Sequence, residues 1–379
     1  MTFKLSDISI FLDNLCYTLY NFTKSKREAR VMNRKLFVMM ILTGIFLVFG
    51  MLSVSGETYS GTCGENAAWE LDTGTGALSI TGMGDLYDYS YESNAPWYDY
   101  RFSIKTAVIQ NGITKIGNNI FYKCTALTEI TIPDSVTSIG NSAFYECDDL
   151  TSISIPDSVA IIGYNAFISC SSLISISIPD SVTSIQSGTF SECSKLTSIS
   201  IPDSVTSLGI HAFLRCPALT SVVLSKNITS LERGLFATSP LLQDITLPFI
   251  GANKLSTGTA EGVLGYIFGT ANTPGTSATV QRYSDSGSAT YYIPSSLRTV
   301  RLTGASQIPY GAFSGCNNIE EIYVNEGVTK ISGYAFSNCE LLQKLAIPRS
   351  VTVFGNYVFT LSPNATIYGK SGSKANTYA

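Results

Sequence analysis

Cysteine has the most regular spacing of any reactive residue in this sequence, and thiols can form disulfides or bind metal ions. Of the nine cysteines, five follow one another at intervals of 23 residues, and two more stand in register further on. Zinc sites need closely spaced ligands such as C-x-x-C, which this chain lacks, and Ser239 replaces one member without a paired loss. We therefore expect buried, reduced thiols in the column Cys124, Cys147, Cys170, Cys193, Cys216, Cys316 and Cys339.

Aspartate recurs at the same interval, and a column of carboxylates could attract calcium. Each member belongs to its own Pro-Asp-Ser turn, however, and calcium needs several oxygens that converge on one point. We therefore expect solvated side chains, with no bound metal and no cofactor. The column consists of Asp134, Asp157, Asp180 and Asp203.

Residues for covalent catalysis or glycan hydrolysis do not form a recognisable set. His211 is the only histidine, and no G-x-S-x-G elbow accompanies it. Glycoside hydrolysis requires paired carboxylates in a cleft, and no such pair can be placed from the repeats. A glycan-active enzyme stays an alternative, but we expect a protein without enzymatic activity.

The outward positions of short strands are the remaining candidates for binding. In the middle of the chain these positions hold serines such as Ser175 and Ser177, which offer little to distinguish one partner from another. Further on they carry charged and aromatic residues, the types that anchor protein interfaces. Neutral drift on a solvated face is the alternative interpretation. We expect ligand contacts at Arg301, Glu321, Tyr323 and Lys344, with Thr299 and Ala346 also facing outward.

A repeat of 23 residues places all of these side chains. The unit reads L-x-x-I-x-I-P-D-S-V-x-x-I-x-x-x-A-F-x-x-C-x-x. Alternation in LTSISIP predicts a short strand with one buried face, which Pro-Asp-Ser ends. One coil cannot bury its own apolar side chains, so stability should depend on stacking between neighbours. The column that we expect to form a structural ladder is Phe121, Phe144, Phe167, Phe190, Phe213, Phe236, Phe313, Phe336 and Phe359.

The unit resembles that of the BspA-type leucine-rich repeat proteins, which are bacterial surface or secreted proteins. Strand, Pro-Asp turn, Ala-Phe pair and cysteine match in register, and the resemblance covers about Ser103 to Ala379. It implies a right-handed, β-rich solenoid with short parallel strands and an N-terminal β cap. It also implies binding of extracellular proteins or glycans in adhesion or host interaction. A structural surface spacer without a specific ligand is the alternative.

Residues 57–102 are predicted to form the N-terminal β cap. Two alternating runs flank the Gly-rich stretch 72–76, which is a hairpin signal. Cys63 stands here without an evident partner. The aromatic residues of this segment either cover the end of the core or stack on sugars, and we favour the first role. They are Tyr87, Tyr89, Tyr91, Trp97, Tyr98 and Tyr100.

The array is interrupted once. Regular repeats occupy 103–247, and the next matching leucine after Leu242 is Leu297. Either one coil carries a long insertion or two coils have degenerated in 248–296, where we expect a structured protrusion. Leucine-rich repeats resume over 297–364. Residues 365–379 resemble a C-terminal cap that is possibly truncated.

The N-terminus carries an export signal. Met32-Asn33-Arg34-Lys35 precedes an uncharged apolar run from Leu36 to Val54, and small residues follow. We interpret 32–56 as a signal peptide or, if uncleaved, a membrane anchor. The sequence leaves the status of the leader 1–31 open. Both versions place the repeats outside the cell or at its surface.

The composition excludes one class of partner. Charged residues make up 14% of the chain, the net charge is −4 and the pI is near 5.2. Because no basic field is present to hold phosphate backbones, we expect no nucleic acid partner. We also expect a monomer that contacts a membrane only through the N-terminal apolar segment.

Overall fold

The computed structural model describes residues 56–90, 93–369 and 371–375. The chain divides into two compact units, Met1–Glu57 and Thr58–Ala379, and the second carries one continuous hydrophobic core of its own. The leader and the apolar run predicted from the sequence lie outside the described residues. Within the described part, no helix is long and apolar enough to cross a membrane.

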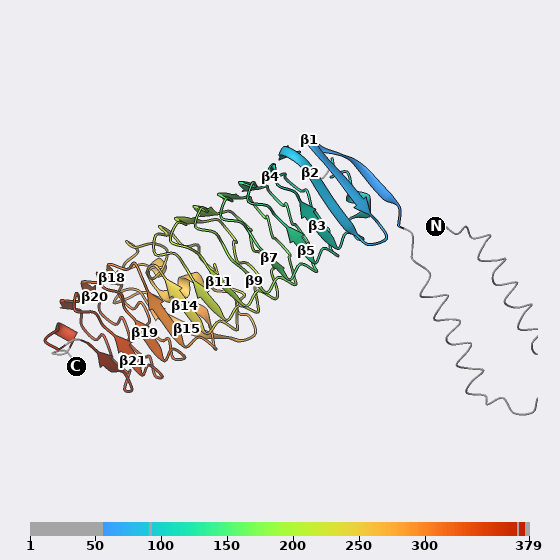
Figure 1. The fold of residues 1–379 in the computed structure, drawn as a ribbon. Coiled ribbons are helices and arrows are strands. Elements are labelled where there is room, and N and C mark those ends of the chain that lie inside the picture. Colours follow the sequence, from blue (N-terminus) through green and yellow to red (C-terminus); the bar gives the residue numbers. More distant parts are fainter. Residues whose placement is uncertain (1–55, 91–92, 370, 376–379) are drawn as a thin grey trace, which may run out of the picture. The chain divides into compact units, whose positions relative to one another are not determined.

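The unit Thr58–Ala379 is a parallel β-solenoid whose coils follow one another along one axis (Figure 1). Each regular coil contributes one short strand to a first face, and most strands there pair in parallel with the strand of the next coil. The predicted β-rich repeat solenoid is confirmed. The first face consists of β3 (Thr106–Ile109), β5 (Glu129–Thr131), β7 (Ser152–Ile153), β9 (Ser175–Ile176), β11 (Ser198–Ser200), β13 (Ser221–Val223), β14 (Asp244–Leu247), β17 (Thr299–Leu302), β19 (Glu321–Tyr323), β21 (Lys344–Ala346) and β23 (Thr366–Tyr368). Among the described residues, no ladder joins β5 to β7 or β9 to β11.

A second face arises where the chain returns after the Pro-Asp-Ser turn. Its strands are two to four residues long, and most bury an isoleucine, such as Ile139 or Ile162, whereas Leu208 and Phe354 at the same position are half-buried. These strands also pair in parallel across coils. The second face consists of β4 (Ile113–Ile116), β6 (Ser138–Ile139), β8 (Ile161–Ile162), β10 (Ser184–Ile185), β12 (Ser207–Leu208), β18 (Gln307–Ile308), β20 (Lys330–Ile331) and β22 (Val353–Phe354).

The third side of each coil is a run of turns that carries the Ala-Phe pair. In most coils two residues adopt left-handed backbone angles there, for example Ser142 (φ 51°) and Glu146 (φ 53°). This conformation lets the coils hydrogen bond without strands: the Phe144 N–H donates to the carbonyl of Ala166 at 2.8 Å. Backbone hydrogen bonds therefore join neighbouring coils on all three sides.

The phenylalanine column runs through the core as stacked rings. Phe121, Phe144 and Phe167 lie 5.3 and 5.2 Å apart with nearly parallel ring planes, and the stack continues to Phe236. Trp97, from the cap, lies 5.9 Å from Phe121 and adds a first rung. The column resumes from Phe313 to Phe336 and ends at Phe359, which is only partly buried.

The cysteines of the described residues are all free and buried, as the sequence predicts. Most of the thiols in the column also donate to the carbonyl of the phenylalanine in the preceding coil. Cys170 Sγ lies 3.1 Å from the Phe144 oxygen, and Cys193 Sγ lies 3.2 Å from that of Phe167. Burial raises the pKa of the Cys170 thiol to about 12, so these thiols stay protonated donors.

The cap is an antiparallel hairpin of β1 (Thr58–Asp72) and β2 (Ala77–Leu86). One end of β2 pairs with β3 and the other with β4, so a single strand starts both faces of the solenoid. The short 3-10 helix η1 (Tyr98–Tyr100) follows before the first coil. The hairpin covers the end of the core, because Trp69 and Leu71 point inward from β1.

The interruption is one coil with a long insertion. β14 and β17 pair directly in parallel, with Asp244 opposite Thr299, which leaves no room for a second degenerate coil between them. The insertion holds two 3-10 turns, η2 (Ala260–Gly262) and η3 (Leu264–Ile267). It also holds an antiparallel hairpin of β15 (Thr276–Arg282) and β16 (Ser288–Pro294).

The β15–β16 hairpin packs on the third side of the next coil. The fully buried Gln281 accepts from the Gly265 N–H and donates to the Ala312 carbonyl at 3.2 Å. Gly311 and Gly315 occupy the two left-handed positions of that coil, and a Cβ at Gly311 would overlap the carbonyl of Arg282. Glycine is needed here because the hairpin backbone approaches closely.

Candidate binding surface

Strand register sets the outward residues of the first face into two straight rows. The five strands from β14 to β23 carry large side chains in these rows, and we call their outward residues the C-terminal strand face. Inward residues of the same strands, such as Ile322 and Leu345, are fully buried. The first row reads Asp244, Thr299, Glu321, Lys344 and Thr366, and the second reads Thr246, Arg301, Tyr323, Ala346 and Tyr368.

Tyr323 is the centre of this face. The Lys344 ammonium donates to the Tyr323 hydroxyl oxygen at 2.8 Å, and the Tyr323 hydroxyl donates to Glu321 Oε2 at 2.7 Å. The Arg301 guanidinium lies 4.8 Å from the centre of the Tyr323 ring, and the Lys344 ammonium lies 4.9 Å from it. The structure therefore brings together all four residues that the sequence singles out for ligand contact.

Two further residues extend the cluster at its ends. Asp244 Oδ1 lies 3.6 Å from Arg301, and the Tyr368 ring lies 6.0 Å from the Lys344 ammonium. Tyr368 keeps 54% of its surface exposed. Sequence reasoning missed both, although each stands at an outward position of its strand, and Asp244 follows from the regular repeat, two residues after Leu242.

Hydrogen bonding and charge favour the protonated form of Lys344. The Tyr323 hydroxyl raises the pKa of Lys344, and the nearby Glu321 carboxylate acts in the same direction. Arg301 is held between the Asp244 carboxylate and the Tyr323 ring. Ring and carboxylate contacts restrict both long side chains, so less conformational entropy is lost when a partner binds.

One predicted outward residue is not available. Thr299 is only 8% exposed, although it points out of the sheet like Asp244 and Glu321 beside it. Its short side chain stands between the longer ones of the flanking strands, which shield it from solvent. Thr299 therefore stands at an outward strand position, as the sequence predicts, but is buried there.

The regular coils present a different surface. Ser152, Ser175 and Ser198 occupy the first row, and all three are exposed. Hydroxyl groups cannot form the ion pairs and ring contacts that join the C-terminal strand face. Their face is flat and carries only small hydroxyl groups.

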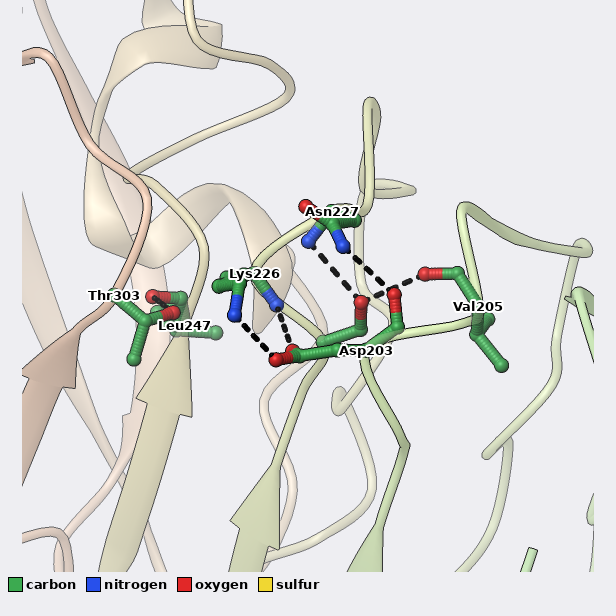
Figure 2. Close-up of polar contacts among 7 residues, drawn as sticks. Asp203, Val205, Lys226, Asn227, Leu247 and Thr303 are labelled. Carbon is green, nitrogen blue, oxygen red and sulfur yellow. Dashed lines mark hydrogen bonds and ion pairs between the residues drawn. The ribbon is translucent and has the colours of Figure 1, made fainter. Parts of the chain in front are cut away.

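The aspartate column lies along the turn edge, where Figure 2 shows its last member. Asp203 Oδ2 lies 2.6 Å from the Lys226 ammonium, and Asn227 donates to the Asp203 carbonyl at 2.7 Å. The pKa of Asp203 is lowered, first by its hydrogen bond from Lys226. Among the described residues, no group of three or more His, Cys, Asp or Glu side chains is placed to hold a metal ion.

The remaining candidates of the sequence lie apart from the C-terminal strand face. His211 is exposed, and its Nε2 lies 4.0 Å from Glu232. In the cap, Trp97 is fully buried, whereas Tyr87 is 48% exposed. Tyr98 stacks on Tyr122 of the first coil. Tyr91 lies outside the described residues.

The repeats match a known protein family. A model of the BspA type leucine rich repeat region matches the chain in six copies, over residues 95–216, 160–257 and 285–372. The chain belongs to the BspA-type leucine-rich repeat family. Proteins with this repeat and fold are generally non-enzymatic. A search of the curated proteins found no match.

Several solved bacterial structures resemble this BspA-type chain. A leucine-rich repeat protein from Eubacterium ventriosum is 20% identical, with 84% of this chain and 98% of that chain covered and a TM-score of 0.40. A leucine rich cell surface protein from Faecalibacterium prausnitzii is 24% identical, with coverage of 85% and 97% and a TM-score of 0.42. The pneumococcal vaccine antigen PcpA is 16% identical, with coverage of 83% and 82% and a TM-score of 0.32.

Proposed function

We propose that this BspA-type protein is exported to the cell surface and binds an extracellular partner, protein or glycan, through the C-terminal strand face. The observation that carries the proposal is the connected cluster of Arg301, Glu321, Tyr323 and Lys344. Tyrosine and arginine are the residue types that dominate binding energy at interfaces. Adhesion to host or neighbouring cells is the role that such a surface would serve.

Surface display is supported by a relative and by the N-terminal sequence. The Faecalibacterium prausnitzii relative is named a cell surface protein. The apolar run from Leu36 to Val54, with the basic residues before it, has the composition of an export signal. Detection of the repeats on intact cells by a protease or an antibody tests this part of the proposal.

A binding screen of the unit Thr58–Ala379 against arrayed matrix proteins and glycans tests recognition. The variant Arg301→Ser, Glu321→Ser, Tyr323→Ser removes the cluster, and we expect it to lose the saturable signal. A matched control, Arg215→Ser, Glu192→Ser, Tyr164→Ser, removes the same residue types elsewhere on the coils and should bind normally. A signal that survives the first variant, or is lost equally in both, would place recognition elsewhere.

A structural spacer is the second candidate, and the serine rows favour it for the regular coils. Small hydroxyl side chains over β7, β9 and β11 give this part little with which to select a partner. Under this alternative the folded unit shows no saturable partner, and the regular coils serve only to hold the rest of the molecule away from the cell.

A further inference from the structure

Charge alternates from strand to strand along the C-terminal strand face. Asp244 on β14 is negative, Arg301 on β17 is positive, Glu321 on β19 is negative and Lys344 on β21 is positive. Neighbouring strands lie about 4.8 Å apart, so the sign repeats about every 9.6 Å. The four charges stand on four successive strands, with Arg301 in the second row and the other three in the first, and their order of sign becomes its own complement when it is reversed.

We propose that this face binds a second copy of the same chain, related by a two-fold axis that runs along the strands between β17 and β19. The proposal rests on the proposed function and names its partner. Such an axis turns the first face of one copy toward that of the other and keeps the strand direction. It places β17 of one copy opposite β19 of the other, β14 opposite β21, and β13 opposite β23.

In the first row this arrangement sets opposite charges against one another. Asp244 stands at the same strand position as Lys344 within its row, so each meets the other across the axis. Both are side chains at the solvent surface, and Asp244 retains 47% of its side-chain area exposed. The buried Thr299 meets Glu321 of the second copy and presents no competing charge.

The second row is complementary as well. Arg301 meets the Tyr323 ring of the second copy. Because the Tyr323 hydroxyl donates a hydrogen bond to Glu321, the guanidinium lies near both an aromatic ring and a carboxylate of that copy. Val223 on β13 is 40% exposed and meets Tyr368, which is 54% exposed, so the outer apolar groups also cover one another. Between them, the short Ala346 faces Thr246 and leaves room for close approach.

A single contact between two copies is weak, but many such contacts can act together. Each exposed ion pair contributes little and is screened by salt, so one pair of molecules dissociates readily. Many copies displayed on one cell surface would act together against those on another, which raises the effective affinity without any new contact. The proposal thus provides adhesion between like cells.

Charge exchange on the purified unit Thr58–Ala379 tests the proposal, with sedimentation equilibrium at low and high salt as the measurement. We expect self-association of the natural sequence at low salt. Arg301→Glu and Glu321→Arg each set like charges against one another and should weaken it roughly tenfold or more. An equimolar mixture of the two variants restores both contacts and should associate again, which misfolded variants could not do.

The variant Arg215→Glu, on another side of the coil, should self-associate like the natural sequence. The proposal is overturned if the natural sequence sediments as a monomer at every soluble concentration at low salt, or if the mixture fails to regain association. If the array screen still shows a partner that is lost with the triple serine variant, recognition by this face stands and only its homotypic partner is wrong.

Discussion

The regular coils and the C-terminal coils share one core but differ in what they show to solvent. Inside, both stack phenylalanines: Phe144 and Phe167 lie 5.2 Å apart, and Phe313 and Phe336 lie 5.3 Å apart. Outside, serines of the regular coils give way to the charged and aromatic cluster around Tyr323. Core and surface therefore vary independently in this solenoid, because alternate residues of each strand point to opposite sides.

The largest expected effect tests whether the regular coils and the C-terminal coils depend equally on the stacked phenylalanines. Phe190→Ala removes a ring that is packed between Phe167 and Phe213, and it should lower the free energy of unfolding by about 3 to 5 kcal/mol. Phe359→Ala, which removes the ring that stacks on Phe336 at the end of the column, should cost clearly less, since that ring is only partly buried. Denaturant unfolding of both variants measures the difference, and equal losses would contradict it.

A second test concerns the coil that carries the hairpin. Gly311→Asn forces a side chain against the carbonyl of Arg282, and we expect a loss of about 1 to 3 kcal/mol and a hairpin that is cut faster by protease. Gly188→Asn is the control in the regular coils, because its Cβ would clash only with the side-chain end of Asn165 and would lie 4.0 Å from the nearest backbone atom, the Asn165 Cα. Similar costs at the two glycines would mean that the hairpin does not pack as described.

A third, smaller effect tests the role of the thiols. Cys193→Ala removes one of two donors to the buried Phe167 carbonyl, which keeps the Cys170 N–H at 3.2 Å, and should cost about 1 kcal/mol. Cys193→Ser should cost less, because the natural Ser362 hydroxyl makes the equivalent bond to Phe336 at 2.6 Å. If alanine is tolerated as well as serine, the thiol acts only as a small apolar group.

The smallest effect distinguishes two members of the aspartate column. Asp203 forms an ion pair with Lys226, and its pKa in the folded protein is lowered. The Asp203 carboxylate therefore stabilises the fold above its unfolded pKa of about 3.9. This stabilisation is lost as the pH falls through the folded pKa. Asp203→Asn should cost less than about 1 kcal/mol at neutral pH and nothing in strong acid. Asp180 forms no ion pair with another described residue, so Asp180→Asn is the control and should cost less than Asp203→Asn at neutral pH.

Much of the fold could be predicted because the 23-residue period repeats every inward side chain. The stacking of Phe121, Phe144 and Phe167 follows from that period alone. The coil at the insertion could not be predicted, since a gap between Leu242 and Leu297 fits one coil or two until β14 is seen to pair with β17. The burial of Thr299 also escaped prediction, because it depends on neighbours in two other coils.

The candidate site was predicted in part. Arg301, Glu321, Tyr323 and Lys344 were found because outward strand positions can be counted from the repeat. Their hydrogen bonds and ring contacts could not be found in this way, because these depend on side-chain length and direction across paired strands. Asp244 was overlooked because it precedes the insertion, while its contact Arg301 follows it.

By itself, the sequence determined which residues face the core, because periodicity two in a strand and 23 along the array assigns each position to one side. Only the tertiary structure decided what the outward residues do together. Asp244 and Arg301 are 57 positions apart, yet they are diagonal neighbours because β14 pairs with β17 across the insertion. Contacts between coils depend on which strands pair, and hydrogen bonding in three dimensions selects that pairing.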